Sequence, residues 1–318
     1  MKAAVVTQAG AAPVYADFAD PVAAPGFAVV EMEASALSHV TRGRASGAHY
    51  SSTGVFPFVA GVDGVGRRAD GSRVYFFAPE PPFGGLAARV PVAEAQCVAL
   101  PEALDARTAA AIAIPGMSSW AALTERARFK AGETVLVNGA TGASGFLAVQ
   151  IAKHLGAAKV IATGRHAATL AALEAAGADV AISLDQDAAS LAEALEKPLR
   201  DGVDVVLDYL WGPSAQTLLT TAAQTLPEAY ALRFVQIGSI GGAQIQLPGA
   251  VLRASAIALL GSGIGSVPMP RLLNAVREVL HAAVPAKLHI ETRAVPLADI
   301  AEHWNAGDSR ARTVFTMA

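Results

Sequence analysis

The chain has 318 residues, of which 53% are hydrophobic and 16% are charged, and this balance excludes an intrinsically disordered protein. Because one hydrophobic core rarely organises so long a chain, the length favours two domains. The formal net charge of −3 leaves no basic footprint for nucleic acid, and no apolar stretch is long enough to span a bilayer. We therefore expect a small-molecule partner and neither nucleic acid nor a membrane.

Cys97 is the only cysteine, which excludes an internal disulfide and any zinc site that needs two or more thiolates. The first residues, MKAAVVTQAG, lack the apolar core of a signal peptide. The sequence therefore favours a cytoplasmic location.

Residues 1 to about 115 alternate short apolar runs with glycine- and proline-containing turns. This pattern is typical of antiparallel β structure. The runs are MKAAVV, FAVVEME, FVAGVDGVG, SRVYFFA and ARVPVAE.

From Thr134 the pattern changes to apolar strands that alternate with helix-length segments, which predicts a parallel sheet wrapped by helices. The predicted strands are TVLVN, KVIAT, DVAIS, VDVVLD, RFVQIG and IALLG. The helical segments include GFLAVQIAKHL, ATLAALEAAG and PSAQTLLTTAAQTL. Six strands are enough for a full doubly wound sheet.

After an amphipathic segment at 271–283, the tail from Lys287 returns to β-like runs, KLHIETRAVPLADI and RTVFTM. We expect this tail to rejoin the first region. The predicted fold is therefore α/β, with a β-rich domain formed by 1–115 and 286–318 and a parallel-sheet domain at 116–285 inserted into it.

The strand TVLVN is followed at once by GATGASG and then by a helical run. The pyrophosphate of a dinucleotide needs close backbone approach, free N–H groups and a helix N-terminus, and AxGxxG between a strand and a helix supplies them. A plain tight turn is the alternative. The cofactor-binding candidates of this turn are Ala140, Gly142, Ala143, Ser144 and Gly145.

The end of the second strand decides the type of dinucleotide, because an acidic residue there would bind the ribose 2′-hydroxyl of NAD. Gly164 lies 19 residues after Gly145, and Arg165 and His166 follow it with no acid among them. Arg165 offers a planar cation to a 2′-phosphate, so we predict NADPH, with His166 as a second contact. Alternatively, Arg165 caps a solvated helix start.

These residues resemble the medium-chain dehydrogenase/reductase superfamily and, within it, the zinc-free quinone oxidoreductases. The resemblance spans nearly the whole chain. It rests on the order of MKAAVV, ALSHVTRGRASGAHY, PFVAGVDGVG, PGMSSWAAL, VLVNGATGASGFLAVQIAKHLGA, VDVVLD, VQIGS and ARTVF. It implies a GroES-like catalytic domain, an inserted Rossmann domain, an active site in the cleft between them and a homodimer.

The sequence also departs from the pattern of the zinc-dependent relatives. Val62 stands where zinc-dependent relatives carry a histidine ligand, and no cysteine lies between residues 75 and 96, where those relatives hold a structural zinc. We therefore predict no metal. A triad of His39, His49 and Asp63 matches no known ligand spacing, so the two histidines are expected to line the substrate cleft and Asp63 to be structural.

Without a metal, an activated acceptor such as a quinone or an α,β-unsaturated carbonyl is easier to reduce than a simple ketone, because the accepted charge delocalises. The resemblance places Tyr50 near the family's active-site tyrosine and Ser38 at the position of its asparagine near the nicotinamide. Both are candidate catalytic residues, with Tyr50 as a proton donor. Packing of Tyr50 against the cleft wall is the alternative.

The remaining cofactor candidates end later strands of the sheet or stand where the family has a residue near the cofactor. They are Tyr209, Gly238, Ser239, Gly261, Ser262 and Arg312. Ordinary turn glycines and a solvated arginine are the alternatives.

The leading hypothesis is an NADPH-dependent quinone or enone oxidoreductase, and the rival is a non-catalytic NADPH-binding redox sensor. The apolar run at 245–260 fits either a dimer that continues the sheet or burial within one subunit.

Overall fold

The computed structural model describes residues 1–52, 54–306 and 311–317. Contacts divide the chain into two compact units, one formed by Met1–Ile114 with Val276–Ala318 and the other by Pro115–Ala275. Within the described ranges, no helix combines the length and the apolar character needed to cross a membrane.

The second unit is built on a six-stranded sheet in the order β11-β10-β9-β12-β13-β14, and every neighbouring pair runs parallel. This confirms the predicted doubly wound sheet, because the order reverses direction at β9. The strands are β9 (Thr134–Asn138), β10 (Lys159–Gly164), β11 (Val180–Ser183), β12 (Val205–Asp208), β13 (Ala231–Gln236) and β14 (Ala256–Gly261).

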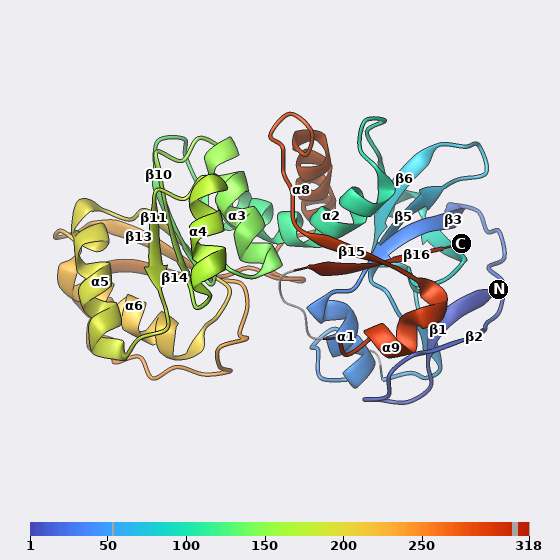
Figure 1. The fold of residues 1–318 in the computed structure, drawn as a ribbon, viewed down its shortest axis with the longest axis horizontal. Helices are drawn as coiled ribbons and strands as arrows, with labels where there is room; N and C mark the ends of the chain where they lie inside the picture. The colour runs from blue at the N-terminus through green and yellow to red at the C-terminus, as the bar shows by residue number, and fades with distance from the viewer. Residues whose placement is uncertain (53, 307–310, 318) are drawn as a thin grey trace. The chain divides into compact units, whose positions relative to one another are not determined.

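Helices cover both faces of this sheet, with α3 and α4 on one face and α5 and α6 on the other (Figure 1). In α5, Leu191, Leu195 and Leu199 recur at a spacing of about one helical turn and are buried against the sheet. The helices of this unit are the π-helical η2 (Ala122–Ala127), α3 (Ala143–His154), α4 (Ala167–Ala175), α5 (Ala188–Asp201), α6 (Gly212–Thr225) and α7 (Gly249–Arg253), while α2 (Ala106–Ala121) and α8 (Met269–Ala282) each have residues in both units.

The first unit contains a three-stranded sheet, β2-β1-β4, and a seven-stranded sheet in which β15-β16-β3-β5-β6-β8 form the path and β7 also pairs with β3. The strands are β1 (Lys2–Val6), β2 (Val14–Asp17), β3 (Phe27–Ala36), β4 (Phe58–Val59), β5 (Asp63–Arg67), β6 (Arg73–Phe77), β7 (Arg89–Ala93), β8 (Cys97–Ala99), β15 (Thr292–Pro296) and β16 (Arg312–Thr316). The helices are α1 (His39–Ser46), α9 (Ile300–His303) and the short η1 (Glu94–Gln96) and η3 (Leu297–Asp299).

The tail returns to the first unit, where β16 pairs antiparallel with β3 (Figure 1). Two details differ from the sequence patterns. The run at 58–66 divides into β4 and β5 of separate sheets, because Gly61 turns the chain with a φ of +105° and lies against the backbone of Leu86. The run at 287–300 forms a strand only over β15 and then enters η3.

Candidate functional site

A glycine turn joins β9 to α3 at the reversal point of the parallel sheet. Gly139 adopts a φ of +90°, which an L side chain rarely tolerates, and Gly145 lies so close to the carbonyl oxygen of Gly139 that a Cβ there would collide with it. Gly142 caps α3 with no side-chain hydrogen bond, and a Cβ on it would meet nothing within 4 Å. The turn is thus open at Gly142, and the first N–H groups of α3, those of Ala143 and Ser144, have no side-chain cap from this residue.

A network of hydrogen bonds between buried polar side chains fixes this turn to the ends of the neighbouring strands. Thr163 Oγ1 accepts from the backbone N–H of Gly139 at 3.1 Å and donates to Asn138 Oδ1 at 2.7 Å. Asn138 Nδ2 donates to Asp208 Oδ1 at 2.8 Å, and the backbone N–H of Trp211 donates to both oxygens of Asp208. Burial raises the pKa of Asp208, while these hydrogen bonds oppose the rise. The network connects the ends of β9, β10 and β12.

Sequence reasoning did not select Asn138 and Thr163, although a signal existed. Each is a polar residue at the end of an otherwise apolar strand, in TVLVN and KVIAT, and each is almost fully buried. A buried polar side chain requires a partner, so their positions at one sheet edge indicated a network there. Ala140, which was selected, is buried and donates its N–H to the Thr163 carbonyl at 2.7 Å.

Gly164 ends β10, and Arg165 and His166 lead into α4. A Cβ on Gly164 would collide with the side chain of Thr141 in the glycine turn, so the two segments touch. Both Arg165 and His166 are exposed, and His166 is the N-cap of α4 without a side-chain cap bond. Within the described part of the chain, Arg165 forms neither a hydrogen bond nor an ion pair, so its guanidinium faces solvent at the carboxyl edge of the sheet.

The later cofactor candidates lie at the ends of β12, β13 and β14. Ser239 and Gly261 line an open pocket of about 460 Å³, together with the indole of Trp211 and the side chain of Gln236. Ser262 donates its N–H to the Gln236 carbonyl at 2.9 Å. The edge of the sheet therefore brings Ser239 and Gly261 to one pocket, and Ser262 directly follows Gly261 in the chain.

Tyr209 and Gly238 do not line this pocket. The Tyr209 hydroxyl is buried close to Ser118 and Ser119, and burial raises its pKa to about 12. A Cβ on Gly238 would approach the Tyr209 carbonyl oxygen to 2.5 Å. Gly238 is therefore required for close packing of two strand ends, and the Tyr209 hydroxyl is directed into the protein.

Arg126, which sequence reasoning missed, fixes the loop after β14. Its Nε donates to the Gly261 carbonyl at 2.7 Å, and its Nη1 donates to the Ser266 carbonyl at 3.4 Å. Arg126 belongs to the π-helical η2, a type of helix often found next to functional sites. Its partners are distant in sequence, so no local pattern reveals this contact.

In the first unit, Ser38 is the N-cap of α1. Its Oγ accepts from the Thr41 N–H at 3.0 Å and shares a hydrogen bond of 2.9 Å with Thr41 Oγ1, and the residue is 5% exposed. Tyr50 is 70% exposed and stacks on the ring of His49 with the centroids 4.2 Å apart. The structure therefore gives Ser38 a capping role and leaves the Tyr50 ring open to solvent.

Asp63, Tyr75 and Arg312 form a buried polar cluster in the same unit. Tyr75 donates to Asp63 Oδ2 at 3.1 Å, while Asp63 Oδ1 and two guanidinium nitrogens of Arg312 are buried without a partner among the described residues. Burial raises the pKa of Asp63 to about 7, opposed by Arg312 and by the hydrogen bond from Tyr75. Burial also lowers the pKa of Arg312. Arg312 is half-buried, and its charge favours the ionised form of Asp63.

Over residues 1–52, 54–306 and 311–317, no group of three or more His, Cys, Asp or Glu side chains is arranged to hold a metal ion. His39 begins α1, His49 lies in the bend that follows it, and Asp63 is directed toward Tyr75. Metal independence of the chemistry stays a prediction.

Comparisons with known proteins agree with this architecture. A family model described as zinc-binding dehydrogenase matches residues 143–282. The chain is 29% identical to a probable NADPH-dependent quinone reductase, tdiC, of Emericella nidulans over 99% of both proteins. It is 34% identical to a human quinone oxidoreductase over 44% of this chain and 45% of that protein.

Solved structures give the same result. The quinone oxidoreductase of Thermus thermophilus, also solved in complex with NADPH, superposes with a TM-score of 0.81 at 26% identity, covering 99% of this chain and 100% of that one. In fold, glycine turn and relatives, the chain is similar to proteins of the medium-chain dehydrogenase/reductase superfamily, which combine a GroES-like and a Rossmann domain. Within that superfamily, the chain is most like the quinone oxidoreductases among the relatives and solved structures above.

Proposed function

We propose that this protein is an NADPH-dependent oxidoreductase that reduces a quinone or an α,β-unsaturated carbonyl compound without a catalytic metal. The observation that carries the proposal is the glycine turn between β9 and α3, which is open at Gly142 and faces the uncapped N-terminus of α3. Such a turn fits a pyrophosphate. When bound, NADPH supplies the hydride, so the protein has to bind, orient and exclude water.

The choice of NADPH is supported by Arg165. It follows the end of β10, where an acid would bind a 2′-hydroxyl, and it is an exposed cation with no other partner in the described ranges. A guanidinium can bind a phosphate through two parallel hydrogen bonds. The names of the two full-length relatives above support the same cofactor.

Metal independence is supported by Val62, a buried apolar residue where the resemblance places a zinc ligand. Without a Lewis acid, the acceptor must delocalise the charge that it receives, which favours quinones and enones. We propose that Tyr50, oriented by its stacking on His49, donates a proton or a hydrogen bond to the acceptor oxygen. Ser38 then acts through the start of α1, which it caps.

A redox sensor that binds NADPH without turnover is the second candidate. It is favoured by the commitment of the Ser38 hydroxyl to Thr41, which removes one candidate from the reacting centre. Both candidates predict binding of NADPH, so only the consumption of NADPH by an acceptor separates them.

We also propose a homodimer formed through the edge of the parallel sheet. β14 is the last strand in the order, and Leu259 on it is 39% exposed. An exposed apolar edge strand is a ready surface for pairing with a second copy. Pairing of two β14 strands would cover this edge.

The test compares the oxidation of NADPH and NADH by the purified protein with menadione as acceptor. We expect turnover with NADPH, and a fall of at least tenfold in the NADPH-to-NADH ratio of kcat/KM in Arg165→Met, because the contact with the 2′-phosphate is lost. Arg200→Met removes an exposed arginine from α5 of the same unit and serves as the matched control. NADPH binding without turnover of any acceptor would favour the sensor, and an unchanged ratio in Arg165→Met would refute the role of Arg165.

A further inference from the structure

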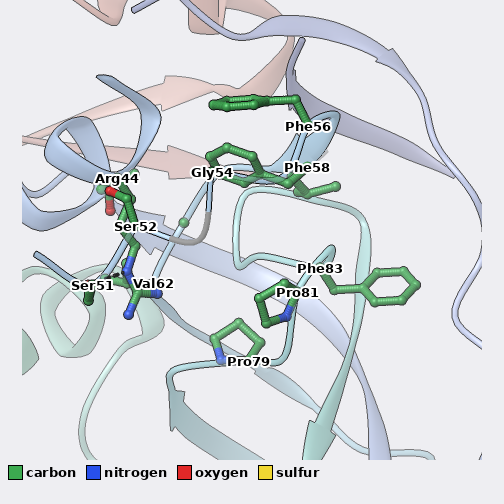
Figure 2. A pocket seen from close by; sticks show the side chains of 13 residues that line it. Arg44, Ser51, Ser52, Gly54, Phe56, Phe58, Val62, Pro79, Pro81 and Phe83 are labelled. Carbon is green, nitrogen blue, oxygen red and sulfur yellow. Dashed lines mark hydrogen bonds between the residues drawn. The ribbon is translucent and has the colours of Figure 1, made fainter. Parts of the chain in front are cut away.

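The first unit contains a pocket of about 50 Å³ between α1, the segment that follows it and the turn after β6. This volume holds about four water molecules, which is comparable to one substituted aromatic ring. Figure 2 shows Arg44, Ser51 and Ser52 on one side of the pocket, and Phe56, Phe58 and prolines on the other. One wall is thus cationic and polar, and the other is apolar.

Arg44 is the charged group of this pocket. Its Nε donates to Ser51 Oγ at 2.9 Å, and Ser51 Oγ also forms a hydrogen bond of 2.8 Å with His49 Nδ1. No residue that lines the pocket is acidic, and within the described ranges Arg44 belongs to no ion pair. Burial lowers the pKa of Arg44. A partly desolvated guanidinium without an anion gains more from an anionic ligand than a solvated one does.

The opposite wall suits a flat ring. The rings of Phe56 and Phe58 lie 5.5 Å apart and are tilted by 49°, and Pro79 and Pro81 extend the apolar surface. Rigid aromatic and proline side chains bind planar apolar groups at a small cost in conformational entropy.

Two lining residues of the pocket are linked to the candidate catalytic residues. Thr41, on its wall, is hydrogen bonded to Ser38, and Ser51 directly follows Tyr50. The wall of the pocket is therefore one hydrogen bond from Ser38 and one residue along the chain from Tyr50.

We propose that this pocket makes the enzyme prefer planar acceptors that carry an acidic substituent, such as an ionised hydroxyl, carboxylate or sulfonate, and that Arg44 determines this specificity. The inference rests on the proposed function, because it names the substrate class of that reaction. In the reaction, the quinone gains a hydride from NADPH and a proton from solvent, giving the hydroquinone and NADP⁺. The anionic substituent stays unchanged and serves only for recognition.

The first experiment measures kcat/KM for anionic naphthoquinone-sulfonate and for neutral menadione in the wild type, Arg44→Met and Arg44→Lys. The intrinsic reactivity of each quinone is the same for every variant. A change between variants in the ratio of kcat/KM for the anionic quinone to kcat/KM for the neutral quinone therefore reports recognition alone. We expect this ratio to fall at least tenfold in Arg44→Met and to recover in part in Arg44→Lys, because a charge-assisted hydrogen bond is lost and then partly restored. Arg67→Met is the matched control, since Arg67, on β5, pairs with Glu33 on β3 outside the pocket.

The second experiment measures binding of naphthalene sulfonate, which cannot be reduced, by calorimetry. We expect weaker binding in Arg44→Met than in the wild type. Turnover of menadione with an unchanged ratio and unchanged sulfonate binding in Arg44→Met would overturn the inference and leave the proposed function standing. Sulfonate binding that depends on Arg44, without reduction of either quinone, would retain the anion-recognising pocket and refute the proposed reaction.

Discussion

Asp63 makes the stability of the protein depend on pH in an unusual direction. The residue is fully buried, one oxygen accepts from Tyr75, and the other has no partner among the described residues. Burial raises its pKa in the folded chain from the ordinary value of 3.8 to about 7. Between these two values the folded chain holds a proton that the unfolded chain has released.

The sign follows from proton linkage. Because the folded state binds the additional proton, this group stabilises the fold at low pH, and its contribution is lost as the pH rises toward the folded pKa. This difference between the pKa values of Asp63 in the folded and unfolded chain corresponds to a loss of roughly 2.5 kcal/mol of unfolding free energy between about pH 5 and pH 8. The Asp63→Asn variant cannot titrate and should lack this loss.

Urea unfolding of the wild type and of Asp63→Asn at the two pH values measures the effect. We expect the difference in unfolding free energy between the two proteins to shift by roughly 2.5 kcal/mol in favour of the variant as the pH rises. Asp185→Asn, which changes an exposed loop aspartate, is the control and should follow the wild type. Parallel pH dependences of the wild type and Asp63→Asn would refute the reasoning, because Asp63 would then be ionised throughout.

Two further predictions concern the glycine turn and the sheet edge. Gly142→Ala should keep the wild-type melting temperature, because the new Cβ meets only open space in the protein, but it should weaken NADPH binding at least tenfold in calorimetry. Gly145→Ala should lower the melting temperature by several degrees, because its Cβ collides with the Gly139 carbonyl. Equal melting temperatures for the two variants would contradict this geometry. Leu259→Lys should convert the proposed dimer to a monomer in light scattering, since a charge on β14 blocks strand pairing; a dimer in both proteins would place the interface elsewhere.

The parallel sheet could be predicted from the sequence because its strands are buried on both faces. TVLVN and VDVVLD are nearly continuous apolar runs, and such runs are characteristic of the central strands of an α/β sheet. The glycine turn was equally visible, because strand, turn and helix are consecutive in the chain. These predictions were possible because each pattern lies within one continuous stretch of the sequence.

The β-rich unit was less predictable. Nothing in the alternation of FVAGVDGVG shows that the turn at Gly61 sends its two ends into different sheets, because the reason is a close approach to Leu86, which is distant in sequence. Similarly, the contact of Arg126 with the loop after β14 and the cluster of Asp63 with Tyr75 join separate segments. Such partners follow from the tertiary fold.

Ser38 is a different case, because its capping role was visible locally. Serine followed three residues later by threonine at the start of a polar segment is compatible with an N-cap, and the resemblance to an active-site position directed attention away from this role. A hydroxyl with both hydrogen bonds inside α1 has little capacity left for a substrate.

The most direct test of the account is the consumption of NADPH by metal-free protein in the presence of a quinone. The protein is dialysed against EDTA, its metal content is measured, and the nicotinamide absorbance is followed with menadione and with naphthoquinone-sulfonate. The account predicts turnover that survives removal of metal and is not increased by added zinc. Loss of turnover in the metal-free protein, restored by zinc, would contradict it.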